Sequence, residues 1–140
     1  MPYFIESIKK QDYPNVTILL VDNSEKKDNP NSIYLKNNYP EIEIIYTGEN
    51  TGFARANNLL ITRAKELSAD YFVSSNIDAI LEKNVVLEVL NAMIKNHQAG
   101  SATCKIKKWD FEKKDSRTKG MTNFIDSVGI SITEKHQFFN

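Results

Sequence analysis

At 140 residues the chain has the length of one domain and can bury a useful core, although it is short for an α/β enzyme. Its 18 basic and 18 acidic residues give a net charge of zero, so no overall field attracts nucleic acid or anionic membranes. The longest apolar runs, VTILLV and NVVLEVL, are too short to span a bilayer, and no signal peptide is evident. A single cysteine excludes an internal disulfide and is typical of a reducing compartment. We therefore expect a cytoplasmic protein with no transmembrane segment and no nucleic-acid partner.

The hydrophobic pattern predicts helices and strands in alternation. From Phe53 to Leu67, apolar residues recur at steps of three and four, which is typical of an amphipathic helix. Residues 16–21 form a continuous apolar run rich in β-branched side chains, as expected for a strand covered on both faces. In chain order, we predict a helix over 3–11, a strand over 16–21, a short helix over 32–38, a strand over 41–47, a helix over 53–67, a strand over 70–76, a helix over 81–97 that begins at Asn84 as a candidate N-cap, and strands over 101–109 and 127–133.

This order of elements predicts an α/β fold with a mostly parallel sheet flanked by helices. Antiparallel strands are expected towards the C-terminus, where residues 101–109 and 127–133 alternate apolar and polar side chains. Cys104 lies on the apolar side of that alternation and is expected to be buried. Residues 108–123 are mostly charged and aperiodic, so we interpret them as a mobile loop. The whole chain, 1–140, is predicted to be a single domain.

Three polar clusters follow predicted strands. They are residues 22–24 (DNS), 49–51 (ENT) and 76–78 (NID). In an open parallel sheet, ligands bind beyond the carboxyl ends of the strands, and these ends lie on one edge of the sheet. The clusters therefore predict a polar ligand site on that edge.

Each cluster also has a purely structural interpretation. Asp22 can accept hydrogen bonds from a nucleobase or a ribose, or it can close the strand with an Asx-turn. If the strand before them continued, Asn76 and Asp78 would point the same way and would suit Mg²⁺ or Mn²⁺ with substrate phosphates; the alternative is a capped strand-to-helix turn. Arg55 opposes the helix dipole in the first turn, which suggests an outside partner such as a phosphate or the face of a nucleobase; the alternative is a solvated surface charge.

The start of the same helix carries three more unusual residues. Gly52 permits a positive φ or a close approach of the backbone to a ligand. Asn57 and Asn58 are poor helix formers. We expect one of the two asparagines to bond a neighbouring loop and the other to be exposed.

The segments SIKKQDYPNVTILLVDNSEKKDN, ENTGFARANN and SSNIDAILEKN, in this order and spacing, resemble family 2 glycosyltransferases of the GT-A fold. The resemblance is strongest for rhamnosyltransferase-like members that make bacterial polysaccharides, and it runs from about Ser7 to Leu90. Beyond Gly100 it depends mainly on FIDSVGISIT, which is similar to the ID-S-x-G segment of the family. The resemblance implies transfer of a sugar from a nucleotide-diphosphate donor to a hydroxyl of a glycan or lipid-linked glycan acceptor, with inversion.

The resemblance also implies roles for residues on the predicted edge. Asp22 would contact the nucleotide base, and Asp78, in an N-x-D form of the D-x-D motif, would bind Mg²⁺ or Mn²⁺ under the diphosphate. Such an ion neutralises the charge that develops on the departing diphosphate. The residues assigned to the nucleotide-sugar site are Asp22, Asn50, Gly52, Arg55, Asn58 and Asn76.

The chain departs from the family pattern in two places. The family begins with a strand ahead of the first helix, and here that helix follows Met1 directly. The family's catalytic base lies well beyond the D-x-D motif, and no residue here is assigned as that base. We therefore expect a fragment of a longer transferase. Loss of the strand would leave two apolar strand edges unpaired, which favours self-association; the full enzyme is expected to associate peripherally with membranes.

Two other classes of protein share parts of this pattern. A receiver-type signalling module also gathers acids at strand ends, but it requires an adjacent acidic pair that the predicted strand ends lack. A non-catalytic α/β nucleotide-binding or protein-interaction module would keep the fold without the chemistry. Binding of a nucleoside diphosphate with Mn²⁺ separates the transferase from an interaction module.

Overall fold

The computed structural model describes every residue except 111, 114–119, 130, 133–137 and 140. The described residues form two compact units. The first unit comprises Met1 and residues 14–79, and the second comprises residues 2–13 and 80–140. The prediction of one domain over 1–140 stays a prediction.

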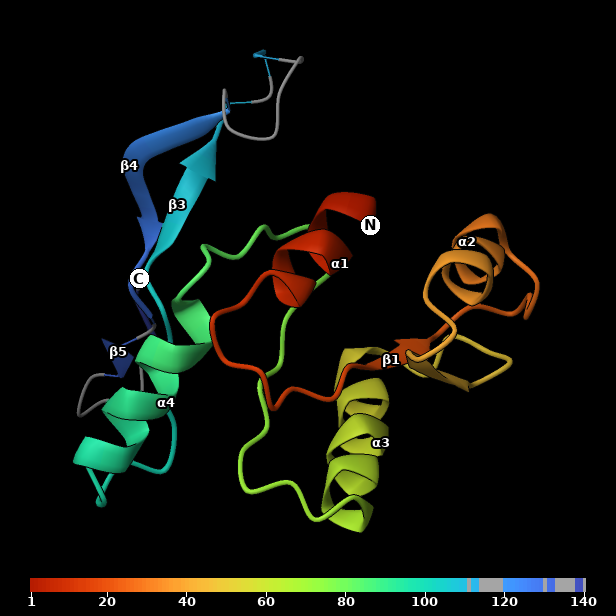
Figure 1. The fold of residues 1–140 in the computed structure, drawn as a ribbon, viewed down its shortest axis with the longest axis horizontal. Coiled ribbons are helices and arrows are strands. Elements are labelled where there is room, and N and C mark those ends of the chain that lie inside the picture. The colour runs from red at the N-terminus through yellow and green to blue at the C-terminus, as the bar shows by residue number, and fades with distance from the viewer. Residues whose placement is uncertain (111, 114–119, 130, 133–137, 140) are drawn as a thin grey trace. The chain divides into compact units, whose positions relative to one another are not determined.

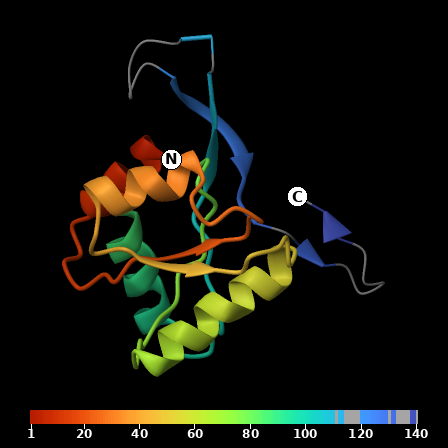
Figure 2. The same ribbon diagram turned by 90° about the vertical axis from the view of Figure 1, so that its right-hand side faces the viewer.

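The first unit is built on a parallel pair of strands. Strand β1 (Leu19–Asp22) pairs with β2 (Glu43–Tyr46) in the register that sets Leu19 opposite Glu43 and Asp22 opposite Tyr46. Figure 2 shows helices α2 (Pro30–Asn38) and α3 (Phe53–Glu66) on opposite sides of this pair. Because the strands are parallel, their carboxyl ends meet at one edge, and the polar loops after Asp22 and Tyr46 begin there.

Local sequence explains the start of α2 and the packing of α3. The Asn29 side chain accepts hydrogen bonds from the amides of Asn31 and Ser32, and Pro30 occupies the first turn, where its missing N–H costs nothing. In α3, the guanidinium of Arg63 donates two parallel bonds to the Glu43 carboxylate on β2, at 2.6 and 3.1 Å. The buried apolar core of this unit comprises Leu35, Ile42, Ala56 and Ala64.

The second unit combines two helices with antiparallel strands, labelled in Figure 1 where there is room. Its elements are α1 (Pro2–Lys9), α4 (Val85–Lys95), β3 (Ile106–Trp109), β4 (Met121–Ser127), β5 (Ser131–Ile132) and β6 (Phe138–Phe139). Strand β3 pairs with β4 and β5 pairs with β6, both in antiparallel register. Phe4 and Ile5 on α1 are its buried apolar side chains among the described residues.

Gln11 connects the two helices of this unit. Its Nε2 donates to the carbonyls of Ser7 (3.0 Å) and Glu82 (2.8 Å), and its Oε1 accepts from the amide of Val86 at 3.0 Å. Asn84 occupies the N-cap position of α4 as predicted, but its side chain makes no capping bond. The capping bond comes instead from Gln11, which is distant in sequence.

In the β3–β4 hairpin, Trp109 lies against Gly120. The amide of Asp110 donates to the carbonyl of Gly120 at 2.8 Å, and a Cβ added to Gly120 would lie 2.2 Å from the nearest atom of the indole. Only glycine therefore fits beneath this tryptophan without a shift of the hairpin.

The structure confirms the mixed α/β class and the helices, and it corrects several predicted strands. Residues 70–76 form no strand, and Tyr71, Phe72 and Val73 are 49%, 38% and 57% exposed. These side chains have strand propensity, but the described structure contains no neighbouring strand that pairs with them, and a strand exists only as part of a hydrogen-bonded ladder.

The C-terminal strands also differ from the prediction. The strand predicted over 101–109 begins only at Ile106, and the one over 127–133 is reduced to Ser131–Ile132, with residues 130 and 133 outside the described part. The predicted mobile loop, 108–123, overlaps β3 and β4 at its ends. Antiparallel pairing between the two strands forms these ends, although their sequence has no periodic pattern that predicts a strand. The centre of that loop lies outside the described residues.

Candidate functional site

Asp22 ends β1 with a carboxylate that accepts hydrogen bonds from three neighbouring side chains. Its Oδ1 accepts from the amide (3.1 Å) and the hydroxyl (2.6 Å) of Ser24, and its Oδ2 accepts from Asn29 Nδ2 (2.7 Å) and from the hydroxyl of Ser32. Partial burial acts to raise the pKa of Asp22, but the hydrogen bonds from Ser24, Ser32 and Asn29 outweigh it and lower that pKa below its ordinary value of 3.8. The turn-closing interpretation of Asp22 is therefore confirmed, and the carboxylate also connects β1 to the start of α2.

Asn23 connects the same turn to the loop that follows β2. Its Nδ2 donates to Asn50 Oδ1 at 3.0 Å. Its Oδ1 accepts from the amide (2.9 Å) and the hydroxyl (2.8 Å) of Thr51 and from the hydroxyl of Thr47 at 3.2 Å. We call these four contacts the inter-loop bonds. They bring the first two predicted polar clusters together.

Gly52 and Arg55 open helix α3 beside these bonds. Gly52 is the N-cap, with φ of +80°, and its amide donates to Asn50 Oδ1 at 3.1 Å. No side chain caps the helix, so the first amides of α3 are free of a side-chain partner in the described structure. Arg55 lies 3.8 Å from the Glu49 carboxylate, and both side chains are exposed, so this ion pair is weak.

The two asparagines of α3 behave as predicted. Asn57 Oδ1 accepts from the hydroxyl of Ser74 at 2.8 Å and so connects α3 to the extended segment after it. The side chain of Asn58 is exposed and has no hydrogen-bond partner among the described residues.

Asn76 and Asp78 are exposed, and their side chains form no hydrogen bond with the other candidates among the described residues. Residues 77 and 78 form a turn, so the strand continuation that would point Asn76 and Asp78 the same way does not occur. Within the described residues, no hydrogen bond or ion pair links either side chain to the Asp22–Asn50 group, and no cluster of three or more His, Cys, Asp or Glu side chains could hold a metal ion. Asp78 alone fits a divalent ion only if a bound diphosphate supplies further oxygen ligands, which is how Mg²⁺ is usually held in phosphate sites.

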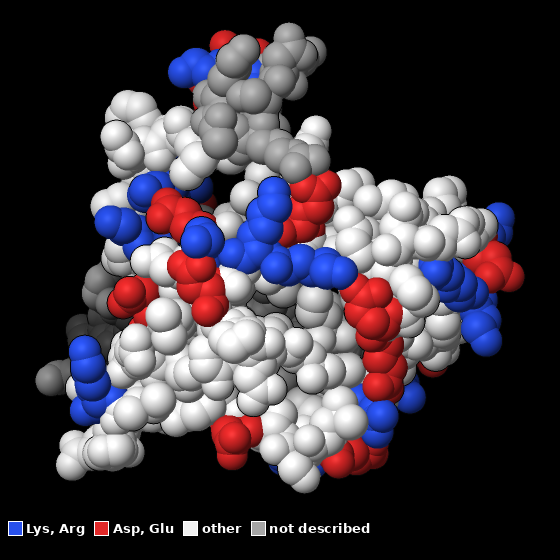
Figure 3. Space-filling view, viewed as in Figure 1, with Lys and Arg blue, Asp and Glu red and all other residues white. Residues whose placement is uncertain are grey.

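Charges of both signs lie interspersed on the face shown in Figure 3. Among the described residues, Lys83 pairs with Asp12 at 2.8 Å and Lys36 with Asp28 at 3.1 Å.

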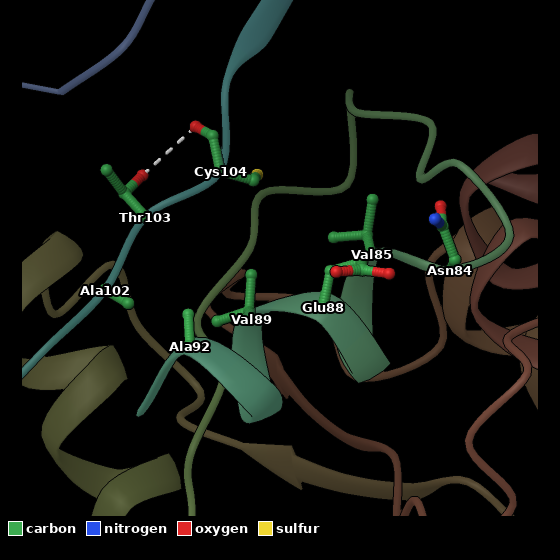
Figure 4. Close-up of a pocket in the computed structure, with 8 residues that line it drawn as sticks. All are labelled: Asn84, Val85, Glu88, Val89, Ala92, Ala102, Thr103 and Cys104. Carbon is green, nitrogen blue, oxygen red and sulfur yellow. Dashed lines mark hydrogen bonds between the residues drawn. The ribbon is translucent and has the colours of Figure 1, made fainter. Parts of the chain in front are cut away.

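The second unit has an open pocket of about 240 Å³ between α4 and the residues before β3 (Figure 4). Val85, Val89 and Ala92 line one side of the pocket, and Ala102, Thr103 and Cys104 line the other. Cys104 is exposed, which corrects the prediction that it is buried. The strand that was predicted to include it begins only at Ile106, so the expected alternation of buried and exposed side chains does not extend to Cys104.

The sequence placed Asn23 in the polar cluster 22–24 but indicated no role for it, and it did not single out Asn29 or Ser32. Asn29 precedes Pro30, which is a recognisable signature of a helix start and could have been found. Asn23 and Ser32 act through partners distant in sequence, and their local context gives no signal for that. The structure thus connects the turn after Asp22 to Asn50 through Asn23, and Asn50 in turn to Gly52. Arg55 follows in the first turn of α3.

Comparison with known proteins agrees with this geometry. The family model described as glycosyl transferase family 2 matches residues 1–138. The chain has no significant match among curated proteins or among solved structures. No described helix is long and apolar enough to cross a membrane. The match covers nearly the whole chain, and the chain therefore belongs to the family 2 glycosyltransferases, with a GT-A-like α/β fold.

Proposed function

We propose that the chain forms the donor-binding part of a metal-dependent, inverting glycosyltransferase that acts in polysaccharide or glycan synthesis. The family implies a nucleotide-sugar donor and a glycan acceptor; a rhamnosyltransferase-like subtype and a lipid-linked acceptor are the finer parts of the proposal. The observation that carries it is the set of inter-loop bonds, which joins the polar loops after β1 and β2 at the carboxyl ends of both strands. Ligands of open parallel sheets bind at that edge.

The nucleotide-sugar residues in this proposal are Asp22, Asn50, Gly52, Arg55, Asn58 and Asn76. The carboxylate of Asp22 already accepts four bonds from its own chain, so contact with a base requires exchange of one of them. The uncapped amides at the start of α3 and the exposed guanidinium of Arg55 both favour the negative charge of a diphosphate.

Asp78 would hold Mg²⁺ or Mn²⁺ together with the diphosphate oxygens, and the ion would supply neutralisation of the leaving diphosphate. Calorimetric titration of the chain with UDP, dTDP, GDP and CDP, each with and without Mn²⁺, tests the proposal. We expect one nucleotide to bind with Mn²⁺ and to bind at least tenfold more weakly without it.

The substitution Asp78→Asn should abolish the Mn²⁺ dependence, because it removes the charged oxygen ligand. Asp70→Asn is the matched control: it removes an exposed carboxylate from the same segment that has no partner among the described residues. Metal-dependent binding that survives Asp78→Asn unchanged would refute the metal site, and the absence of binding to all four nucleotides would refute the function.

Self-association is a further part of the proposal. Within the described residues, β1 pairs with β2 alone, so its other edge keeps unpaired backbone groups. The exposed apolar residues 71–73 add surface that water solvates poorly. Sedimentation velocity at several concentrations should show oligomers, and a concentration-independent monomer would contradict this part. Peripheral membrane association of a longer enzyme and a cytoplasmic location, which suits the single cysteine, complete the proposal.

A non-catalytic nucleotide-binding or interaction module is the second candidate. The lack, among the described residues, of any cluster of three or more His, Cys, Asp or Glu side chains that could hold a metal ion favours it. Release of nucleoside diphosphate from a nucleotide sugar, above the rate of the Asp78→Asn variant, would exclude it.

A further inference from the structure

Asn23 makes the direct side-chain hydrogen bonds between the end of β1 and residues 48–52 that the structure describes. In that stretch, the remaining described hydrogen bonds and ion pairs stay within the loop or run to α3, as between Asn50 Oδ1 and the amide of Gly52. Thr47, which follows β2, is a second connection: its amide and its hydroxyl each lie 3.1 Å from the carbonyl oxygen of Asp22, and its hydroxyl lies 2.7 Å from the carbonyl oxygen of Glu49. Asn23 is the side chain that bonds residues 50 and 51 directly to the end of β1.

The chemistry of the inter-loop bonds requires an amide. The same side chain donates through Nδ2 to Asn50 and accepts two bonds through Oδ1 from the amide and the hydroxyl of Thr51. The single hydroxyl hydrogen of Thr47 is shared among Asn23 Oδ1 (3.2 Å), the Asp22 carbonyl (3.1 Å) and the Glu49 carbonyl (2.7 Å). A carboxylate of the same shape cannot donate, and a serine is too short to serve both purposes. With two bonds to its oxygen and one from its NH₂ group, Asn23 has little capacity left for a ligand.

The bonds also act on the start of α3. Asn50 Oδ1 accepts from both Asn23 Nδ2 and the amide of Gly52, so one oxygen connects the turn after β1 to the N-cap residue of α3. Arg55 lies in the first turn after that N-cap and does not touch Asn23. A shift of Asn50 would move Gly52 and, with it, the guanidinium of Arg55.

We propose that Asn23 is a positioning residue, which holds the first turn of α3 and Arg55 at the distance from the β1 turn that the donor diphosphate requires. This inference rests on the proposed function. The bonds lie near the surface, so their loss should change geometry more than it changes overall stability.

The first test uses no ligand. Amide hydrogen exchange measured by NMR should show at least a tenfold faster exchange at Thr51 in Asn23→Ala, because the acceptor of its amide is lost. The interior of α2 should exchange at its original rate. Unchanged exchange at Thr51 would overturn the inference whatever the chain binds.

The second test is a double-mutant cycle on nucleotide binding. The probe is whichever of UDP, dTDP, GDP and CDP binds the wild-type chain with Mn²⁺. We expect Asn23→Ala and Arg55→Ala each to weaken binding about tenfold, and the double variant to lose at least threefold less than the product of the two. A merely structural role for Asn23 would give independent, multiplicative losses, and that result would overturn the inference.

Two further variants separate geometry from charge. Asn23→Asp keeps the acceptor for Thr51 but turns an oxygen towards Asn50 Oδ1, so it should weaken binding as the alanine variant does. Asn15→Asp adds the same charge at an exposed site in the same unit and should leave binding within twofold. If the wild-type chain binds none of the nucleotides, the proposed function fails with the inference; if it binds and the Asn23 variants bind equally well, the inference alone fails.

Discussion

Replacement of Asp22 by asparagine should destabilise the first unit and remove part of its sensitivity to acid. The amide keeps one oxygen and places an NH₂ group where the other oxygen accepted two bonds. At the position of Oδ1 the NH₂ group would face the hydroxyl donor of Ser24, and at the position of Oδ2 it would face the donors of Asn29 and Ser32. Bonds to a charged acceptor contribute about 1.5–3 kcal/mol when buried, and the half-exposed site lowers this, so we expect a loss of about 2 kcal/mol in the free energy of unfolding.

The pH dependence follows from the direction of the pKa shift. Because the folded-state pKa of Asp22 lies below 3.8, the ionised carboxylate stabilises the fold above that pH, and this stabilisation is lost as the pH falls through the folded-state value. The variant lacks the titrating group and should lose less stability between pH 5 and pH 3 than the wild-type chain.

Thermal unfolding followed by circular dichroism at pH 7, 5 and 3 measures both effects. For a unit of this size, about 1 kcal/mol corresponds to roughly 4–8 °C in Tm. Asp28→Asn is the matched control, since it removes an exposed carboxylate whose pairing with Lys36 is screened by solvent and should leave Tm nearly unchanged. Equal Tm values for Asp22→Asn and the wild-type chain at pH 7, with parallel losses on acidification, would refute the structural role of the carboxylate.

Three other substitutions probe the packing. Gly120→Ala would place a Cβ 2.2 Å from the indole of Trp109 and should cost about 2 kcal/mol or more in thermal unfolding; an unchanged Tm would show that the hairpin relaxes freely. Gln11→Ala removes the bond that caps α4 at Val86, and chemical denaturation should show a loss of about 1 kcal/mol, whereas no loss would mean that water caps the helix equally well. Arg63→Lys keeps the charge but loses the paired bonds to β2, so a small decrease in Tm is expected, and a larger decrease in 1 M salt than in 0.1 M would contradict an electrostatic contribution.

The sequence predicted the helices well because each depends on a local pattern. The period of apolar residues from Phe53 to Leu67 and the position of Asn84 both agree with the observed helix bounds to within a few residues. The side-chain bonds of Asn57 and the exposure of Asn58 also followed from their poor helix propensity.

The strands were harder to predict because pairing is not a local property. Residues 70–76 have the composition of a strand, but that composition does not reveal whether a partner is present. Met121–Ser127 pairs across a charged connection whose sequence has no period. The candidate site shows the same division: Asp22 and Gly52 follow from strand ends and backbone freedom, whereas the role of Asn23 depends on residues 24 to 28 positions away.

Because the indole of Trp109 lies against Gly120, the intrinsic tryptophan fluorescence of the chain reports on one part of the fold. Trp109 is the one tryptophan in the sequence, and it lies in the second unit. Its emission therefore reports the opening of the β3–β4 hairpin, while the parallel strands β1 and β2 and the loops after them contribute no indole signal. A melting curve followed by tryptophan emission and one followed by the circular dichroism of the helices would coincide only if both units unfold together.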